Sequence, residues 1–229
     1  MEERSNTIKI EHVSKQFRSE TVVKDVSVEL EGGHIYGIVG KNGSGKTVLL
    51  KMIAGYLHPA SGAVYVGKQR IGDDIDFPQN MGLIIETPGF LSQYSGYDNL
   101  KYLADIRGVI GKDEIWKAME RVGLDPQSHK KVGKYSLGMR QRLGIAQAIM
   151  EDPDILLLDE PMNGLDQKGI EEIRELLQEL RQEGRLIIIT SHYKEDVEIC
   201  DKVFQMNNGE LFLLAEKFSA NGENDKELQ

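Results

Sequence analysis

The chain has 229 residues with 28 basic and 37 acidic side chains, so its formal net charge is −9. Hydrophobic residues make up 40% and charged residues 28% of the chain, a balance typical of a globular protein and not of a disordered one. The negative charge argues against nucleic acid as a main partner. The single cysteine, Cys200, excludes an intrachain disulfide and a cysteine-based zinc site, and we expect it to be a buried thiol.

No apolar run approaches the ~18 residues that span a bilayer, and the first nine residues are too polar for a secretory signal. We therefore expect a cytoplasmic protein that meets a membrane only through a partner.

The first third of the chain alternates short apolar segments with glycine-rich turns. We predict strands over residues 22–30, 35–39 and 64–66, and a helix over 47–54 that Gly55 ends.

Residues 91–150 have the periodicity of a mostly helical insert. We expect Asp98 to cap a helix that stops at Gly108, a second helix over 115–122 that ends at Gly123, and a third helix capped by Ser136.

Strand and helix patterns then alternate again. Residues 155–158 and 186–189 are continuous apolar runs typical of parallel strands buried on both faces, and an amphipathic stripe runs over 170–180. This order predicts an α/β fold with right-handed crossovers, followed by a polar tail after residue 215.

The glycine-rich segment at residues 40–47, GKNGSGKT, matches the phosphate-binding pattern G-x-x-x-x-G-K-[ST]. It follows an apolar strand and opens a helix, so backbone N–H groups and the helix N-terminus would face one anion. We expect Lys46 to reach the β- and γ-phosphates and the Thr47 hydroxyl to bind Mg²⁺.

The run ILLLDE at residues 155–160 has the form of a Walker B strand. We expect Asp159, at the carboxyl end of the strand, to hold Mg²⁺, and Glu160 to act as the general base toward the attacking water.

The segment at residues 135–142, YSLGMRQR, resembles the signature of the ATP-binding cassette (ABC) family of transport ATPases. It keeps Ser136 and Gly138, but Tyr135, Leu137 and Met139 replace the usual leucine, first glycine and glutamine. The rest of the family pattern follows in order, with Asp166 in the D-loop position and His192 in the switch position. The resemblance covers residues 7–215.

The resemblance implies a P-loop NTPase of ABC type with a mostly parallel central sheet, an N-terminal antiparallel β subdomain and a helical insert. The single domain would consist of a nucleotide-binding core (1–90 and 151–215), a helical subdomain (91–150) and a tail (216–229). The residues expected to bind nucleotide, in either copy of a head-to-tail dimer, are Phe17, Gly40, Lys41, Asn42, Gly43, Ser44, Gly45, Lys46, Thr47, Val48, Ser136, Gly138 and Asp166. Phe17 would stack on adenine.

Glu86 stands where the family usually has a glutamine. This glutamate resembles the bacitracin- and lantibiotic-type exporter and immunity branch. It implies a third metal ligand beside Thr47 and Asp159, with Mg²⁺ offsetting the added charge.

The resemblance implies that the catalytic residues are Lys46, Glu160 and His192 and that the cofactors are ATP and Mg²⁺. Two cassettes, identical or paired, would close around ATP and drive a separate membrane permease. Two alternatives stay open: a soluble ABC ATPase and an ATP-sensing regulatory module, both without a permease.

Overall fold

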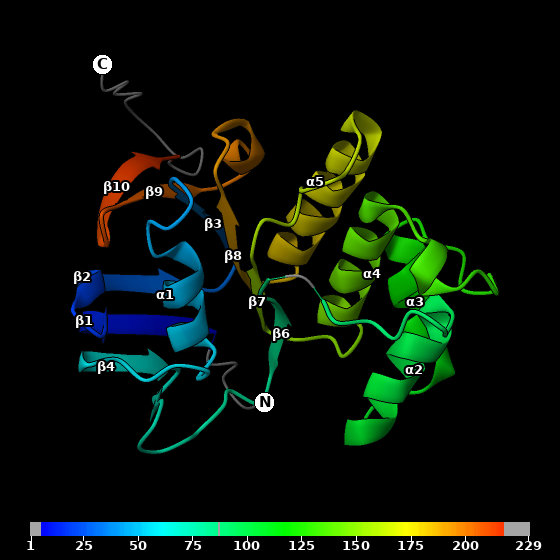
Figure 1. Ribbon diagram of the computed structural model, residues 1–229, viewed down its shortest axis with the longest axis horizontal. Helices are drawn as coiled ribbons and strands as arrows, with labels where there is room; N and C mark the ends of the chain where they lie inside the picture. Colours follow the sequence, from blue (N-terminus) through cyan, green and yellow to red (C-terminus); the bar gives the residue numbers. More distant parts are fainter. Residues whose placement is uncertain (1–5, 87, 218–229) are drawn as a thin grey trace.

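Two sheets and a group of helices form the part of the chain that a computed structural model describes, residues 6–86 and 88–217 (Figure 1). The antiparallel sheet has the order β2-β1-β4-β5, with β1 (Thr7–Phe17), β2 (Glu20–Glu31), β4 (Ser61–Val66) and β5 (Gln69–Arg70). The central sheet has the order β10-β9-β3-β8-β7-β6, with β10 (Glu210–Glu216), β9 (Lys202–Asn207), β3 (His34–Val39), β8 (Leu186–Ser191), β7 (Ile155–Leu158) and β6 (Met81–Ile84). Only β10 runs antiparallel to its neighbour, so the expected mostly parallel sheet is confirmed.

The helices lie on opposite sides of the central sheet (Figure 1). Helix α1 (Lys46–Ile53) lies beside the antiparallel sheet, and α5 (Gln167–Gln182) lies on the other side. Helix α4 (Leu137–Ile149) packs against β6, and α2 (Gly96–Arg107) and α3 (Lys112–Arg121) lie outside it. Two short 3₁₀ turns, Val132–Lys134 and Glu195–Val197, complete the described helices.

The central strands are apolar throughout because both of their faces are covered. Successive side chains of a strand point to opposite faces. Ile155 and Leu157 therefore pack in the core on the α1 side, whereas Leu156 and Leu158 pack in the core on the α4 and α5 side. All four are buried, which explains why this segment does not alternate in polarity.

The cap of helix α2 differs from the sequence-based prediction. Ser95, and not Asp98, is the N-cap, because the Ser95 hydroxyl accepts a hydrogen bond from the backbone N–H of Asp98. Asp98 instead completes a capping box from the third helical position. Two other predicted ends are confirmed, since Ser136 caps α4 and Gly108 follows α2 in the left-handed conformation. The helix predicted over 115–122 starts earlier, at Lys112.

Five strands were not predicted individually: β1, β5, β6, β9 and β10. The hairpin of β9 and β10 turns at Asn208 and Gly209, which have φ values of 49° and 86°. An Asn-Gly pair is a strong hairpin signal. The residues after it, Leu211–Leu214, are all apolar and do not alternate with polar residues, so the strand was not recognised. Most of the predicted tail, from residue 218 onward, lies outside the described residues.

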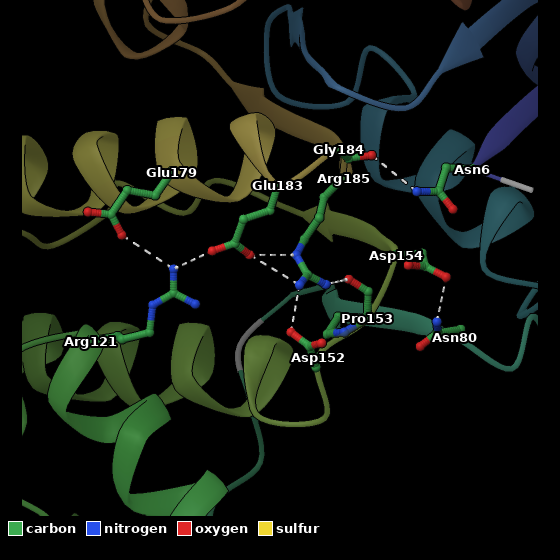
Figure 2. A network of polar contacts seen from close by, with 10 residues as sticks. All are labelled: Asn6, Asn80, Arg121, Asp152, Pro153, Asp154, Glu179, Glu183, Gly184 and Arg185. Atoms are coloured by element: carbon green, nitrogen blue, oxygen red, sulfur yellow. Dashed lines mark hydrogen bonds and ion pairs between the residues drawn. The ribbon is translucent and has the colours of Figure 1, made fainter. Parts of the chain in front are cut away.

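A polar network ties the elements together at the amino ends of the central strands (Figure 2). Arg185, just before β8, is buried and donates to the Pro153 carbonyl and to Asp152 Oδ1, both just before β7. Arg121 of α3 pairs with Glu179 and Glu183 at the end of α5, with the nearer oxygen at 3.3 Å. The outer helices are thereby joined to the core at the edge opposite the carboxyl ends of the parallel strands.

Among residues 6–86 and 88–217, no helix is long and apolar enough to cross a membrane.

Candidate functional site

The loop of residues 40–47 joins the carboxyl end of β3 to α1, and its glycines are required by the backbone. Gly45 has a φ of 109°, and a Cβ there would lie 2.7 Å from the Val22 carbonyl oxygen. A Cβ on Gly40 would lie 2.4 Å from the Met206 carbonyl oxygen. A side chain at either position would displace the backbone, so the close curl of this loop depends on glycine.

The loop presents a lysine and an unpaired hydroxyl. Lys46 Nζ donates to the carbonyl oxygens of Gly40 (2.7 Å) and Lys41 (3.2 Å). Burial lowers the pKa of Lys46, while the carboxylates of Glu160 and Asp159 act in the opposite direction. The hydroxyl of Ser44 is buried without a hydrogen-bond partner, a polar group that a phosphate oxygen would satisfy. The loop therefore fits a polyphosphate.

Thr47 and Asp159 lie side by side at the carboxyl edge of the sheet. The Thr47 hydroxyl donates to Asp159 Oδ2 over 2.7 Å, and Thr190 donates to Asp159 Oδ1. Hydroxyl and carboxylate oxygens suit Mg²⁺, which is often held by one or two protein oxygens together with substrate phosphates. In the described part of the chain, no cluster of three or more His, Cys, Asp or Glu side chains offers a complete cage. The donor set thus fits Mg²⁺ bound together with a phosphate ligand.

Glu160 follows Asp159 in a left-handed conformation, with a φ of 50°. Its backbone N–H donates to Thr190 Oγ1 over 3.0 Å. Its carboxylate lies 3.3 Å from His192 Nδ1 and accepts a hydrogen bond from the Asn163 side-chain amide. The structure thus brings Glu160 and His192 together and holds the carboxylate between two side chains.

Glu86 does not contact the other expected metal ligands in the described structure. Its Oε1 lies 2.5 Å from the ammonium of Lys51 on α1, and no contact found among the described residues joins it to Thr47 or Asp159. The cation that meets this added carboxylate in the structure is therefore Lys51. That Glu86 binds Mg²⁺ stays a prediction.

Phe17 and part of the phosphate loop are exposed to solvent. Phe17 is 43% exposed at the end of β1, with Lys15 Nζ 5.4 Å from its ring centre, and its stacking on adenine stays a prediction. Lys41, Asn42 and Gly43 are exposed, and Val48 is partly buried in α1.

The signature residues form a separate cavity of about 630 Å³ between α4 and the start of α5. Ser136, Gly138 and Asp166 all line it. Ser136 Oγ caps α4 by accepting from the Met139 N–H at 3.1 Å, and Asp166 Oδ1 caps α5 by accepting from the Gly169 N–H at 3.0 Å. Within the described part of the chain, no contact joins these residues to Lys46 or Asp159, so one chain holds the two predicted halves of the site apart.

Sequence reasoning assigned no role to four residues that contact the site: Thr190, Asn163, Gln141 and Lys51. Gln141 donates from its side-chain amide to the Glu160 carbonyl over 3.3 Å. Of these four residues, only Thr190 could have been found from the sequence, because it directly follows the apolar run 186–189 that leads to His192. The contacts of the other three depend on the tertiary structure and leave no pattern in the sequence.

Comparison with known proteins gives one consistent family. The model of a family described as ABC transporter matches residues 23–163. The chain is 44% identical over 207 residues to the bacitracin transport ATP-binding protein BcrA of Enterococcus faecalis, covering 89% of this chain and 67% of that one. It is 34% identical over 223 residues to the lantibiotic transport ATP-binding protein SrtF of Streptococcus pyogenes, covering 96% of this chain and 95% of that one.

The fold is similar to that of a solved dimer of MJ0796, described as a bacterial ABC transporter cassette. The TM-score is 0.81 at 23% identity, covering 89% of this chain and 96% of that chain.

Proposed function

This chain belongs to the ABC transporter family and is an ATPase of the ATP-binding cassette type, and from that premise we propose that it is the motor subunit of a transporter. Two cassettes close head to tail around ATP and drive a separate membrane permease. The observation that carries this proposal is the meeting of Lys46, Thr47, Asp159, Glu160 and His192 at one edge of the sheet.

Each of these residues has one part in the proposed reaction. Lys46 binds the β- and γ-phosphates. Thr47 and Asp159 would hold Mg²⁺, which would supply positive charge to the phosphates. Glu160 takes a proton from the water that attacks the γ-phosphorus. The bond to the bridging oxygen breaks, and its electron pair leaves with ADP. His192, beside Glu160, stabilises the charge on the transferred phosphate.

The second half of the site would come from a second cassette. Ser136 and Gly138 lie at the N-terminus of α4, where helix N–H groups favour an anion. They line a cavity of their own, and neither contacts Lys46 among the described residues. A head-to-tail arrangement would place them over the γ-phosphate held by the other copy.

Phosphate release in the presence of Mg²⁺ tests the ATPase part of this proposal. We expect ATP-dependent release that rises more than linearly with protein concentration, since two cassettes complete each site. A linear dependence, with a monomer in solution when ATP is bound, would contradict the head-to-tail arrangement.

Recovery of the chain from detergent-solubilised native membranes tests the permease part. We expect a multi-span membrane protein to accompany it, which would place the chain at the cytoplasmic face. Recovery of only soluble proteins, with ATPase activity intact, would favour a soluble ABC ATPase.

The proposed cargo is a peptide antibiotic, which the cell exports or against which it protects itself. The support is the similarity to relatives named for bacitracin and lantibiotic transport. Cells that lack the gene should become more sensitive to peptides of these two kinds and should regain resistance when it is restored. Unchanged sensitivity to both kinds would separate the cargo proposal from the motor proposal.

A further inference from the structure

Lys51 lies one helical turn beyond the predicted metal ligand Thr47. Both residues belong to α1, and residues four apart on a helix share one face. The Lys51 side chain is 27% exposed, and its ammonium lies 2.5 Å from Glu86 Oε1. A positive charge is thus fixed beside the site at which Mg²⁺ would bind.

Glu86 is held close to the same site by its backbone. It follows β6, where Ile84 is the register partner of Leu158 in β7. The N–H of Asp159 donates to the Ile84 carbonyl over 2.7 Å, so the segment leading to Glu86 passes alongside Asp159. Glu86 has a φ of 63°, a conformation that a residue other than glycine rarely adopts and that clusters at functional sites.

These two observations pair the Glu86 carboxylate with Lys51, on a segment that runs alongside Asp159. We propose that Lys51 is the positioning residue for Glu86 and competes with Mg²⁺ for its carboxylate. This inference rests on the proposed function, because it takes Thr47 and Asp159 as the core of the magnesium site. Lys51 holds Glu86 beside that site before the metal is bound. The strength of the Lys51–Glu86 ion pair then sets the Mg²⁺ concentration at which the Glu86 carboxylate leaves Lys51 and binds the metal.

A Mg²⁺ titration of the full chain with a fluorescent ATP analogue tests the competition without turnover. We expect Lys51→Gln to lower the Mg²⁺ concentration for half-maximal binding about two- to fivefold, the range expected for a partly exposed ion pair. Lys51→Arg, which keeps the charge, should leave it unchanged. Affinity for the analogue without Mg²⁺ should be the same in all variants, since Lys51 acts through Glu86.

The same titration in a Glu86→Gln background separates competition from simple charge repulsion. There, Lys51→Gln should no longer shift the Mg²⁺ requirement. If Lys51→Gln shifted the Mg²⁺ requirement equally in the unmodified and Glu86→Gln backgrounds, or in neither, the inference would be overturned. The proposed nucleotide binding would not be affected by that result. Failure of the unmodified chain to bind the analogue at any Mg²⁺ concentration would overturn the proposed function and this inference with it.

Discussion

The hydroxyl of Thr190 donates a hydrogen bond to Asp159 and accepts one from the backbone N–H of Glu160. Thr190 is the next-to-last residue of the buried strand β8 and is itself fully buried, so no water replaces either bond. One side chain on β8 therefore fixes both acidic residues that follow β7. The register between the two strands thereby sets the geometry of the proposed metal ligand and general base.

Thr190→Val tests this link, because valine keeps the shape and removes the hydroxyl. Unpaired buried polar groups cost about 1–3 kcal/mol each. We therefore expect lower stability in urea and at least about tenfold slower Mg²⁺-dependent phosphate release, since ~1.4 kcal/mol corresponds to tenfold. The matched control, Thr190→Ser, keeps the hydroxyl and should stay close to the unmodified protein. Equal behaviour of the two variants would show that the hydroxyl has no such role.

Glu160→Gln should bind ATP normally and hydrolyse it at least about 100-fold more slowly, because positioned general bases contribute roughly 10²–10⁴-fold. Binding of a fluorescent ATP analogue and release of phosphate report the two properties separately. Glu175→Gln, an exposed glutamate on α5, is the control for the loss of one negative charge. Normal turnover by Glu160→Gln would disprove its assignment as general base.

Gly138→Ala tests the packing between the signature segment and the loop before α5. A Cβ on Gly138 would lie 2.8 Å from the Gly164 carbonyl oxygen, closer than backbone atoms tolerate. Alanine is favoured over glycine in a helix by about 1 kcal/mol, whereas overpacking costs about 1–3 kcal/mol. We expect the second effect to prevail and the free energy of unfolding to fall.

The control for this substitution is Gly89→Ala, where an added Cβ would meet no atom within 4 Å. Urea denaturation should show almost no change for it. A gain in stability for Gly138→Ala would mean that the contact with Gly164 yields easily.

Cys200 makes the fold sensitive to alkali. Burial raises the pKa of its thiol above the usual 9.0, and the Asp201 carboxylate raises it further. Above about pH 9 the unfolded chain loses this proton while the folded chain keeps it, so stability falls as the pH rises. One proton contributes about 1.4 kcal/mol for each pH unit in this range.

Cys200→Ala should remove this part of the pH dependence. Comparing urea denaturation at pH 7.5 and pH 10, we expect the unmodified protein to lose about 1.4 kcal/mol more stability than the variant. Each protein serves as its own reference, so the cavity left by the smaller side chain does not enter the comparison. Equal losses would show that the thiol ionises without unfolding.

The phosphate loop and the Asp159–Glu160 pair were predictable because each is written in consecutive residues. Their place at one edge of the sheet also followed from the order of the elements, since the carboxyl ends of parallel strands share an edge. The capping role of Ser136 was local for the same reason. The cap of α2 was assigned to the wrong residue because Ser95 and Asp98 are both good caps, and only the backbone decides between them.

Contacts across long separations could not be deduced in this way. Thr190 and Asp159 are 31 residues apart, and Lys51 and Glu86 are 35 apart. Which side chains meet depends on strand register, on the face of α1 that Lys51 occupies, and on a left-handed residue at Glu86. None of these quantities leaves a pattern in neighbouring residues.

The amino-acid order alone therefore predicted the family, the phosphate loop and the acidic pair, because short-range backbone geometry and strand polarity follow from nearby residues. Only the tertiary structure showed that Glu86 pairs with Lys51. It also showed that Thr190 forms hydrogen bonds with both Asp159 and Glu160. Those pairings depend on how separate elements pack, and packing is a property of the whole chain.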